Sequence, residues 1–238
     1  MTKPDFLSRA TGYPYAAPAH DYLFRAGRAE PLDPGHDLDA LIAVLAIGSN
    51  RAPEQLARKF GEGPEMAIPV TWGRLDGFDV VYSAHMAGYG SIPATVHASP
   101  GTSVSVAVTW LTEKQLVRMH ETEAVGTNYD YGRISSEAVR LSDGRTFSGA
   151  GCYIGRRGAL ALDGEPVALA EIDADGRTFT AEPQLQMLDR VHSAHGTGEA
   201  FEPWLAGHVE SPDRRKVLTD RLALTAEPFD HPAFAFDR

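Results

Sequence analysis

The run of eight apolar residues from Ala40 to Ile47 stops abruptly at Gly-Ser-Asn, residues 48–50, and a helical pattern begins at once. The run predicts a buried strand over Leu41–Ile47 and is far too short to cross a bilayer. A strand that turns through such a loop into a helix gathers free backbone N–H groups at one point, where anions bind. An ordinary helix cap without any ligand explains the same three residues, so the turn alone leaves both interpretations open.

The rest of the chain alternates between short apolar runs and a few amphipathic segments. A helix is expected over residues 51–60, with Asn50 or Ser49 as its cap, Pro53 in its first turn and Gly61 as its stop. Further strands are expected at 78–86, 93–99, 103–111, 132–141, 146–155 and 167–173, and further helices at 112–124, 182–195 and 212–223. Because strands and helices do not alternate regularly, the sequence predicts an α+β fold with a largely antiparallel or closed sheet.

Residues 1–37 are rich in Pro, Gly, Ala and Tyr and show no helical or strand period. Their aromatic side chains are costly to leave in water, so we expect an arm that packs on the surface, as a lid or as a dimer contact. A loose tail is the alternative. We expect one domain over residues 38–225, followed by a tail at 226–238. The sequence leaves open whether the chain forms a homodimer.

Charge and composition narrow the classes of partner. The formal net charge of −10 argues against nucleic acid and anionic membranes, because both favour a basic face, but it allows a small molecule that carries a carboxylate. Cys152 is the single cysteine, so an internal disulfide is excluded. The N-terminus lacks the apolar core of a signal peptide, and a cytoplasmic location is expected. His192 and His195 share a helix face without a third ligand nearby, so no metal site is predicted.

The expected helix 112–124 carries a carboxylate on its apolar side. Glu123 lies seven residues after Leu116 and four after Met119, on the apolar stripe, whereas Glu121 lies roughly 140° from Leu116 and should be solvated. Burial and the negative end of the helix dipole both favour the protonated form of Glu123, which makes a Glu a usable base near neutral pH. If the helix ends early, Glu123 reaches water instead, and the helical argument leaves these alternatives even.

Taken in order, these pieces resemble the gamma-glutamylcyclotransferase-like family. In that family a YGSN-type loop follows the first strand, a Glu in an LD..EG context is the acid–base residue, and tyrosines follow it. The corresponding stretches here are AIGSN (46–50), SIPATVHASPGTSVSVAVTWLT (91–112), RMHETEAV (118–125), TNYDYGR (127–133) and GCYIG (151–155). The resemblance implies a small mixed or antiparallel β-barrel with flanking helices and a pocket at its mouth.

The resemblance also implies a set of site residues. It makes Glu123 the catalytic acid–base residue and assigns substrate binding to the loop and two tyrosines: Ile47, Gly48, Ser49, Asn50, Tyr129 and Tyr153. The sequence departs from the family at Ile47, where a Tyr is expected, at His120, where Asp is expected, and at Ala124, where Gly usually follows the catalytic Glu. Ile47 removes a hydroxyl from the edge of the site, so we expect Tyr129 or Tyr153 to point one into the pocket.

The reaction that the resemblance implies is a ring closure without a cofactor. The α-amine of a small γ-glutamyl compound attacks its own γ-carbonyl, which forms 5-oxoproline and releases an amine, a lyase or transferase activity. One alternative is an amidase-type hydrolase of a small amide or ureido compound that uses the same Glu and loop. Another is a non-catalytic small-molecule-binding or scaffolding domain. Release of 5-oxoproline separates the first from the second, and binding without turnover indicates the third.

Overall fold

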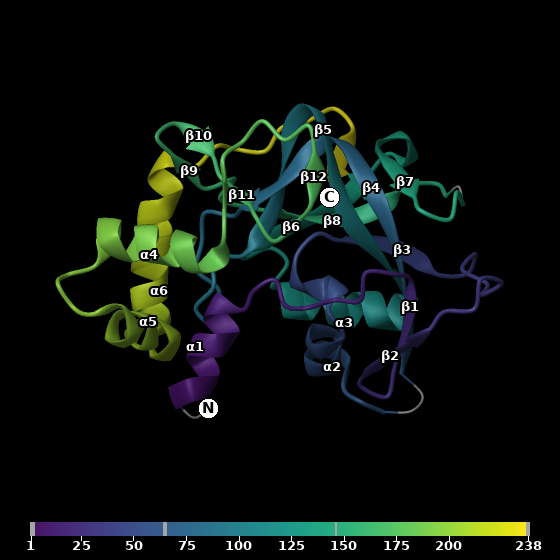
Figure 1. Ribbon diagram of the computed structural model, residues 1–238, viewed down its shortest axis with the longest axis horizontal. Helices are drawn as coiled ribbons and strands as arrows, with labels where there is room; N and C mark the ends of the chain where they lie inside the picture. Colours follow the sequence, from purple (N-terminus) through teal and green to yellow (C-terminus); the bar gives the residue numbers. More distant parts are fainter. Residues whose placement is uncertain (1–2, 64–65, 146, 237–238) are drawn as a thin grey trace.

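The computed structural model describes residues 3–63, 66–145 and 147–236, and one large sheet forms its centre (Figure 1). The two long strands β4 and β5 form its central antiparallel pair. The path across it is β13 (Ala181–Glu182), β11 (Ala168–Leu169), β4 (Ala67–Tyr82), β5 (Ala94–Leu111), β3 (Ile42–Ala46), β8 (Ala150–Gly155), β6 (Tyr129–Ile134) and β14 (Phe234–Phe236). Neighbours are antiparallel except for the parallel pairs β3–β8 and β11–β13.

Shorter strands lie beside this path. They are β1 (Tyr22–Arg25), which pairs with β4 and with β2 (Arg28–Pro31), β7 (Val139–Leu141) on β4, β12 (Ala174–Asp175) on β5, and the separate hairpin of β9 (Ala161–Leu162) and β10 (Glu165–Pro166). Within the described ranges, no pairing joins the end strands β13 and β14. The expected α+β class is therefore confirmed, but the sheet is open and "barrel" describes it only loosely.

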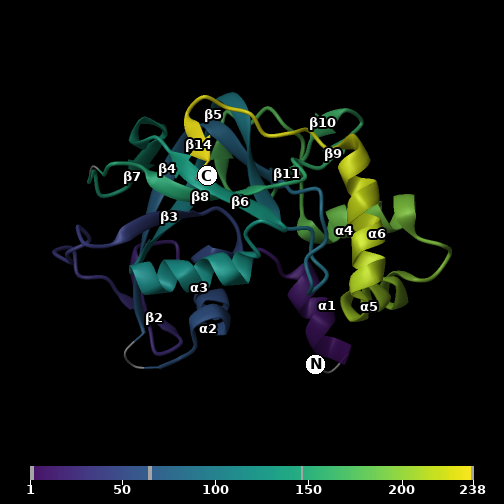
Figure 2. The same ribbon diagram turned by 180° about the vertical axis from the view of Figure 1, so that it is seen from behind.

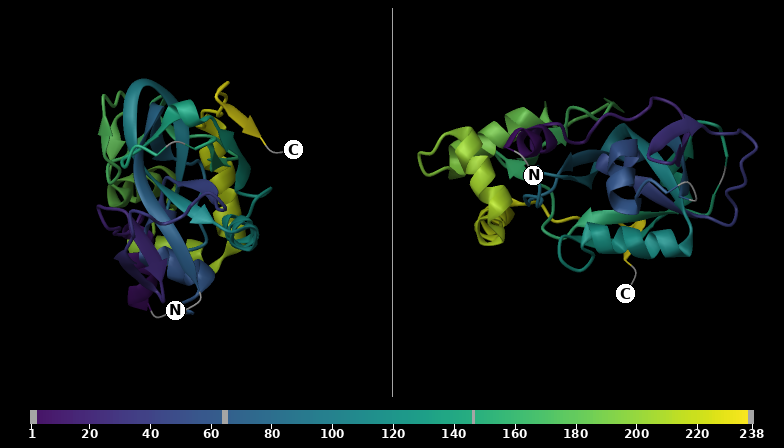
Figure 3. Two further views of the ribbon diagram at one scale, coloured as in Figure 1. Left: turned by 90° about the vertical axis from the view of Figure 1, so that its right-hand side faces the viewer. Right: turned by 90° about the horizontal axis from the view of Figure 1, so that it is seen from below.

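The helices form two groups (Figures 1 and 2). The first, α2 (Pro53–Phe60) and α3 (Glu113–Glu123), covers one face of the sheet, where Leu56 and Met119 pack against strand residues in one apolar cluster. The second group lies at the far end of the molecule and consists of α1 (Lys3–Thr11), α4 (Gln184–His195), α5 (Phe201–Glu210) and α6 (Pro212–Leu222). Seen from below, α1 lies beside these C-terminal helices, on the side that faces α2 (Figure 3). No helix in the described part of the chain is long and apolar enough to cross a membrane.

Side-chain caps mark the start of two helices. The side chain of Thr112 accepts the Gln115 N–H, and the Thr112 N–H donates to the Gln115 side chain, so α3 begins with a capping box. Ser211 caps α6. At α2 the expectation was wrong. Its cap is Ala52, without a side-chain hydrogen bond, and residues 49–51 form the short 3₁₀ helix η1 (Ser49–Arg51) instead.

The N-terminal residues have more regular structure than their composition predicts. The region expected to lack a period contains α1 and the β1–β2 hairpin, and its aromatic side chains are buried: Tyr13, Tyr15, Tyr22 and Phe24. Packing against the rest of the fold stabilises these elements in place of a sequence period. At the other end, residues 234–236 form β14 instead of a tail. The domain limits at 37 and 225 stay a prediction.

Two long strands replace several short ones that the pattern predicts. The expected strands 93–99 and 103–111 are one continuous strand, β5, and most of the expected strand 78–86 is the second half of β4. The register of this pair shifts at Asp76–Phe78, where Gly77 has a φ of 81° that favours glycine. The expected strand 146–155 starts at a residue outside the described ones, and the strand observed there begins at Ala150. Two short strands, β6 and β7, lie in place of the expected strand 132–141.

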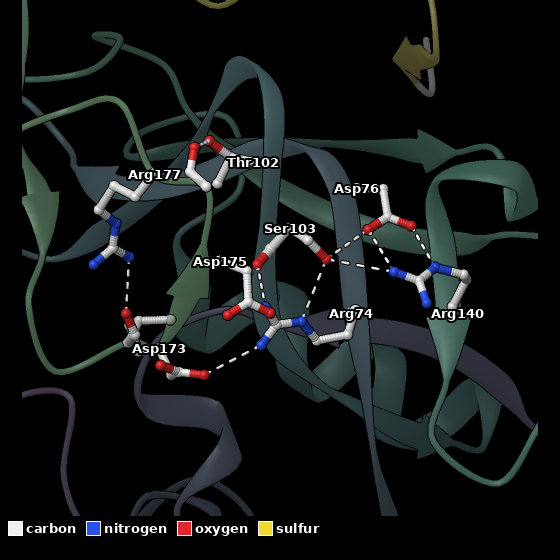
Figure 4. Close-up of polar contacts among 10 residues, drawn as sticks. Arg74, Asp76, Thr102, Ser103, Arg140, Asp173, Asp175 and Arg177 are labelled. Atoms are coloured by element: carbon white, nitrogen blue, oxygen red, sulfur yellow. Dashed lines mark hydrogen bonds and ion pairs between the residues drawn. The ribbon is translucent and has the colours of Figure 1, made fainter.

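A network of charges on the β4–β5 pair connects it to neighbouring strands (Figure 4). Arg74 on β4 contacts Asp173, at 3.2 Å, and Asp175. Asp76 accepts hydrogen bonds from Arg140 of β7, and Ser103 of β5 bonds to both Arg74 and Asp76. Each of these charges has an opposite charge in contact, so we assign the network a structural role, with a small contribution from each exposed pair.

Candidate functional site

A cavity of about 380 Å³ lies where the end of β3 meets α2, the last turn of α3 and the N-terminal segment. Every residue that the sequence analysis assigned to the site lines it: Ile47, Gly48, Ser49, Asn50, Glu123, Tyr129 and Tyr153. The mixed sheet and the two helices on its face bring these residues together from four separate parts of the chain. Their roles stay predictions, but their positions around one cavity follow from the fold.

The two acids near the end of α3 differ sharply in exposure. The Glu123 side chain is 14% exposed, whereas that of Glu121 is 60% exposed and pairs with Arg118 in solvent. Burial therefore separates the two acids as the helical spacing predicts. Glu123 is the last residue of α3, so its carboxylate leaves the helix directly into the cavity wall.

Both protein partners of the Glu123 side chain contact the same carboxylate oxygen. Asn50 Nδ2 donates to Glu123 Oε1 at 2.7 Å, and the ammonium of Lys59 contacts the same oxygen. Lys59 is itself buried, and its Nζ lies 3.5 Å from Met119 Sδ. The contact between the two opposite charges offsets part of the cost of burying each of them. Among the described residues no donor contacts Oε2, so this oxygen is available to a ligand in the cavity.

The loop after β3 presents unbonded polar groups to the same cavity. In the described part of the chain, the N–H groups of Gly48, Ser49 and Asn50 donate to no turn, loop or side-chain acceptor. Asn50 Oδ1 is buried without a donor, and so is Oε1 of Gln55 on α2. A 180° flip of the Asn50 side-chain amide would not satisfy Oδ1, because it would break the hydrogen bond from Nδ2 to Glu123. The site thus offers both donors and acceptors that a polar ligand would satisfy.

Both predicted tyrosines line the cavity, and both hydroxyls have partners. Tyr129 donates to the Ala94 carbonyl oxygen at 3.1 Å, and the Tyr153 hydroxyl lies 2.9 Å from His120 Nδ1. Burial raises the pKa of both phenols, so both stay protonated near neutral pH. His120, which stands where the family has Asp, thus positions Tyr153.

The departure at Ala124 has a local cost. Ala124 is the C-cap of α3 and has a φ of 51° and a ψ of 53°, the left-handed conformation in which glycine is favoured. An L-residue there costs about 1 kcal/mol relative to glycine. The backbone turns at this position as it would with glycine, so the substitution leaves Glu123 at the helix end.

The sequence analysis missed the residues that the N-terminal segment and α2 contribute. Tyr13 and Arg9 line the cavity from the first segment, and Gln55, Arg58 and Lys59 line it from α2. A signal for Lys59 was available, because it follows Leu56 by three residues and so lies near the apolar side of the same helix, as Glu123 does on α3. No local signal pointed to Tyr13, whose partner Ala94 is distant in the sequence.

The described histidines lie in different parts of the fold. Within residues 3–63, 66–145 and 147–236, no group of three or more His, Cys, Asp or Glu side chains is placed to hold a metal ion. His192 Nε2 lies 2.8 Å from the Glu199 carbonyl oxygen, in the C-terminal helices. His85 lines the cavity, and burial lowers its pKa to about 3, so it is a neutral imidazole near pH 7.

Comparison with solved structures finds several similar chains. The structure is similar to that of a gamma-glutamyl cyclotransferase. The two chains are 16% identical, with a TM-score of 0.41 over 81% of this chain and 91% of the other. An uncharacterized protein from Homo sapiens is 14% identical, with a TM-score of 0.42 over 81% and 92% of the two chains. A protein from Arabidopsis thaliana, solved in solution, is 16% identical, with a TM-score of 0.39 over 66% and 87%. No protein-family model and no curated protein matches the sequence.

Proposed function

We propose that this chain cleaves a small γ-glutamyl compound by intramolecular attack of the α-amine, with release of 5-oxoproline and an amine. The observation that carries the proposal is the state of Glu123. Its carboxylate is buried in a cavity wall, Lys59 and Asn50 hold one oxygen, and the other oxygen is open to the cavity. The order of the sequence motifs that resemble the cyclotransferase-like family supports the same reaction.

Glu123 would move one proton in this reaction. The α-amine nitrogen forms a bond to the γ-carbonyl carbon, and Glu123 Oε2 takes the proton that the nitrogen loses. The bond from that carbon to the leaving nitrogen then breaks, and Glu123 returns the proton to the leaving amine. An α-amine titrates near pH 8, so a carboxylate in a preorganised site can accept its proton as the new bond forms. Because the ring closure is intramolecular, correct positioning supplies much of the acceleration.

The unbonded groups around the cavity match an amino-acid headgroup. The N–H groups of Gly48, Ser49 and Asn50 would bind the α-carboxylate, as backbone donors before a helix do in other proteins. Asn50 Oδ1 and Gln55 Oε1 would accept N–H groups of the substrate, because a buried acceptor left without a donor costs about 1–3 kcal/mol. The substrate would thus be oriented through its α-carboxylate and its N–H groups.

The test is product identity combined with two matched acid variants. The wild type is incubated with a panel of L-γ-glutamyl amino acids and amines, and 5-oxoproline and free glutamate are measured by mass spectrometry. We expect 5-oxoproline from the wild type. Glu123→Gln should keep the fold but lower turnover by about 10²–10⁴-fold, and Glu121→Gln, on the solvent side of the helix, should change little.

Other results of these assays would favour one of the two alternative functions. Free glutamate in place of 5-oxoproline would mean that water attacks the carbonyl, as in an amidase-type hydrolase. Binding of these compounds without turnover would indicate a non-catalytic binding or scaffolding domain. Equal activity of the two variants would contradict the role of Glu123.

A further inference from the structure

The N-terminal segment places a tyrosine hydroxyl in the cavity wall. Tyr13 follows α1, is 4% exposed and lines the cavity. Its hydroxyl oxygen accepts the Ala94 N–H at 2.8 Å, at the first residue of β5. It also lies so close to Gly48 that a Cβ at that position would overlap it. The hydroxyl is therefore fixed between the loop after β3 and the start of β5.

The hydrogen bond with Ala94 does not use the hydroxyl proton of Tyr13. Ala94 donates to a lone pair of the hydroxyl, and among the described residues no acceptor takes the hydroxyl's own proton. Tyr129 differs, because it donates its proton to the Ala94 carbonyl oxygen, and the Tyr153 hydroxyl is paired with His120. Tyr13 thus brings to the cavity a fixed O–H group that is free to donate.

The phenol of Tyr13 is also held in its protonated form. Burial raises the pKa of Tyr13 well above its usual value, and the negative charge of Glu123 acts in the same direction. At neutral pH the group is therefore a neutral donor and does not compete with Glu123 as a base. A fixed neutral donor stabilises a charge that develops during the reaction without any reorganisation.

We propose that the Tyr13 hydroxyl donates a hydrogen bond to the γ-carbonyl oxygen of the substrate and stabilises the negative charge that forms there when the amine attacks. This role rests on the proposed function. Tyr13 keeps its proton throughout, while Glu123 carries the transferred proton. The loop N–H groups are left to the α-carboxylate, so this carboxylate and the oxyanion that forms at the γ-carbonyl have separate donors. The N-terminal segment then belongs to the catalytic site.

The decisive variant is Tyr13→Phe, which removes only the oxygen atom. We expect kcat to fall by about 10²-fold with little change in KM, because the donor acts mainly in the transition state. Tyr15→Phe is the matched control. It removes a hydroxyl of the same segment, which bonds to the Arg9 carbonyl oxygen at 3.2 Å, and Tyr15 does not line the cavity. Its kcat should equal that of the wild type.

A second measurement tests the same role in case Tyr13→Phe fails to fold. A ring-fluorinated tyrosine at position 13 keeps the ring and the hydroxyl and makes the phenol a stronger donor. We expect kcat to change with the degree of fluorination while KM stays constant, which a purely structural hydroxyl would not cause.

The outcomes separate this inference from the function on which it rests. If Glu123→Gln is inactive but Tyr13→Phe has wild-type kcat, or changes only KM, the role of Tyr13 is overturned and the cyclotransferase function stands. A kcat that is insensitive to fluorination overturns it equally. If the wild type releases no 5-oxoproline from the γ-glutamyl panel, both are overturned.

Discussion

Lys59 and Glu123 are charges on the buried faces of two different helices, and each compensates for the other. Moving either group alone out of water would cost several kcal/mol, whereas the pair in contact recovers most of that cost. The pair also has a directional effect, because Lys59 and Asn50 occupy one carboxylate oxygen and leave the other to the cavity. Lys59 is therefore a positioning residue for the proposed base.

Lys59→Met should destabilise the fold by about 3 kcal/mol, because Glu123 stays at the cavity wall without its partner. The double variant Lys59→Met, Glu123→Gln should recover a large part of this loss, since no unpaired charge remains. Urea unfolding of the two single variants and the double variant gives the coupling energy. Lys114→Met, on the exposed side of α3, is the control and should change stability little. Additive effects of the two site substitutions would contradict the pairing.

Residue spacing placed Glu123 on the apolar stripe of its helix, but it left open whether the helix extends that far, and the resemblance supplied the role of the residue. The same spacing argument would have found Lys59, had the apolar pattern of 51–60 been used as well as its capping signals. Tyr13 could not be found in this way. Its hydrogen bond spans 81 residues, and no local period or motif encodes a contact between an irregular segment and the start of a strand.

At the scale of elements, the loop after β3 owes its shape to what packs against it. Space explains the glycine at position 48, since a side chain there would overlap the Tyr13 hydroxyl. The sequence pattern correctly indicated a strand, a tight turn and a helix, but it misplaced the cap, because the Asn50 side chain bonds to Glu123 instead of the helix end.

Gly48→Ala should destabilise the protein by about 1–3 kcal/mol, because the new Cβ forces Tyr13 out of its place. In a Tyr13→Phe background the same substitution should cost clearly less, because the overlapping oxygen is gone. Gly61→Ala is the control. Gly61 has a φ of 82° and open space around it, so its cost is one of backbone strain and should be the same in both backgrounds. Chemical unfolding of the four Gly48 and Tyr13 combinations measures the difference, and equal costs of Gly48→Ala in both backgrounds would contradict the explanation.

For the whole molecule, the sequence predicted the class of fold but not how its parts meet. Alternating and apolar runs indicated many strands with few helices, and the α+β class follows from that order. The strand order, the open sheet and the two helix groups depend on pairings between distant segments. The same is true of α1, whose packing on α4 and α5 is not visible in any local period. Burial in this assembled interior also determines how the fold responds to acid.

His85 should make the folded state sensitive to acid. Burial, aided by Arg157, lowers its pKa to about 3, whereas in an unfolded chain a histidine titrates near 6.5. Between these values only the unfolded chain binds the proton, so stability is present above pH 6.5 and is lost as the pH falls towards 3. At pH 5 His85 alone accounts for a loss of about 2 kcal/mol relative to pH 7.

Urea unfolding at pH 7 and pH 5 checks this effect. His85→Gln should lose about 2 kcal/mol less than the wild type between the two pH values. His20→Gln, at an exposed position, should lose as much as the wild type. An identical pH dependence of His85→Gln and the wild type would show that the burial of His85 does not contribute.

The path of the N-terminal segment has a consequence for how the protein is made. Tyr13 is synthesised 81 residues before Ala94, whose N–H it accepts, and α1 is synthesised well before α4 and α5, on which it packs. For most of translation this segment therefore has no folded surface to bind, and its buried aromatic side chains remain in water. The cavity is completed only when this segment folds back onto parts of the chain that are synthesised later, so its residues acquire their native contacts long after they are made.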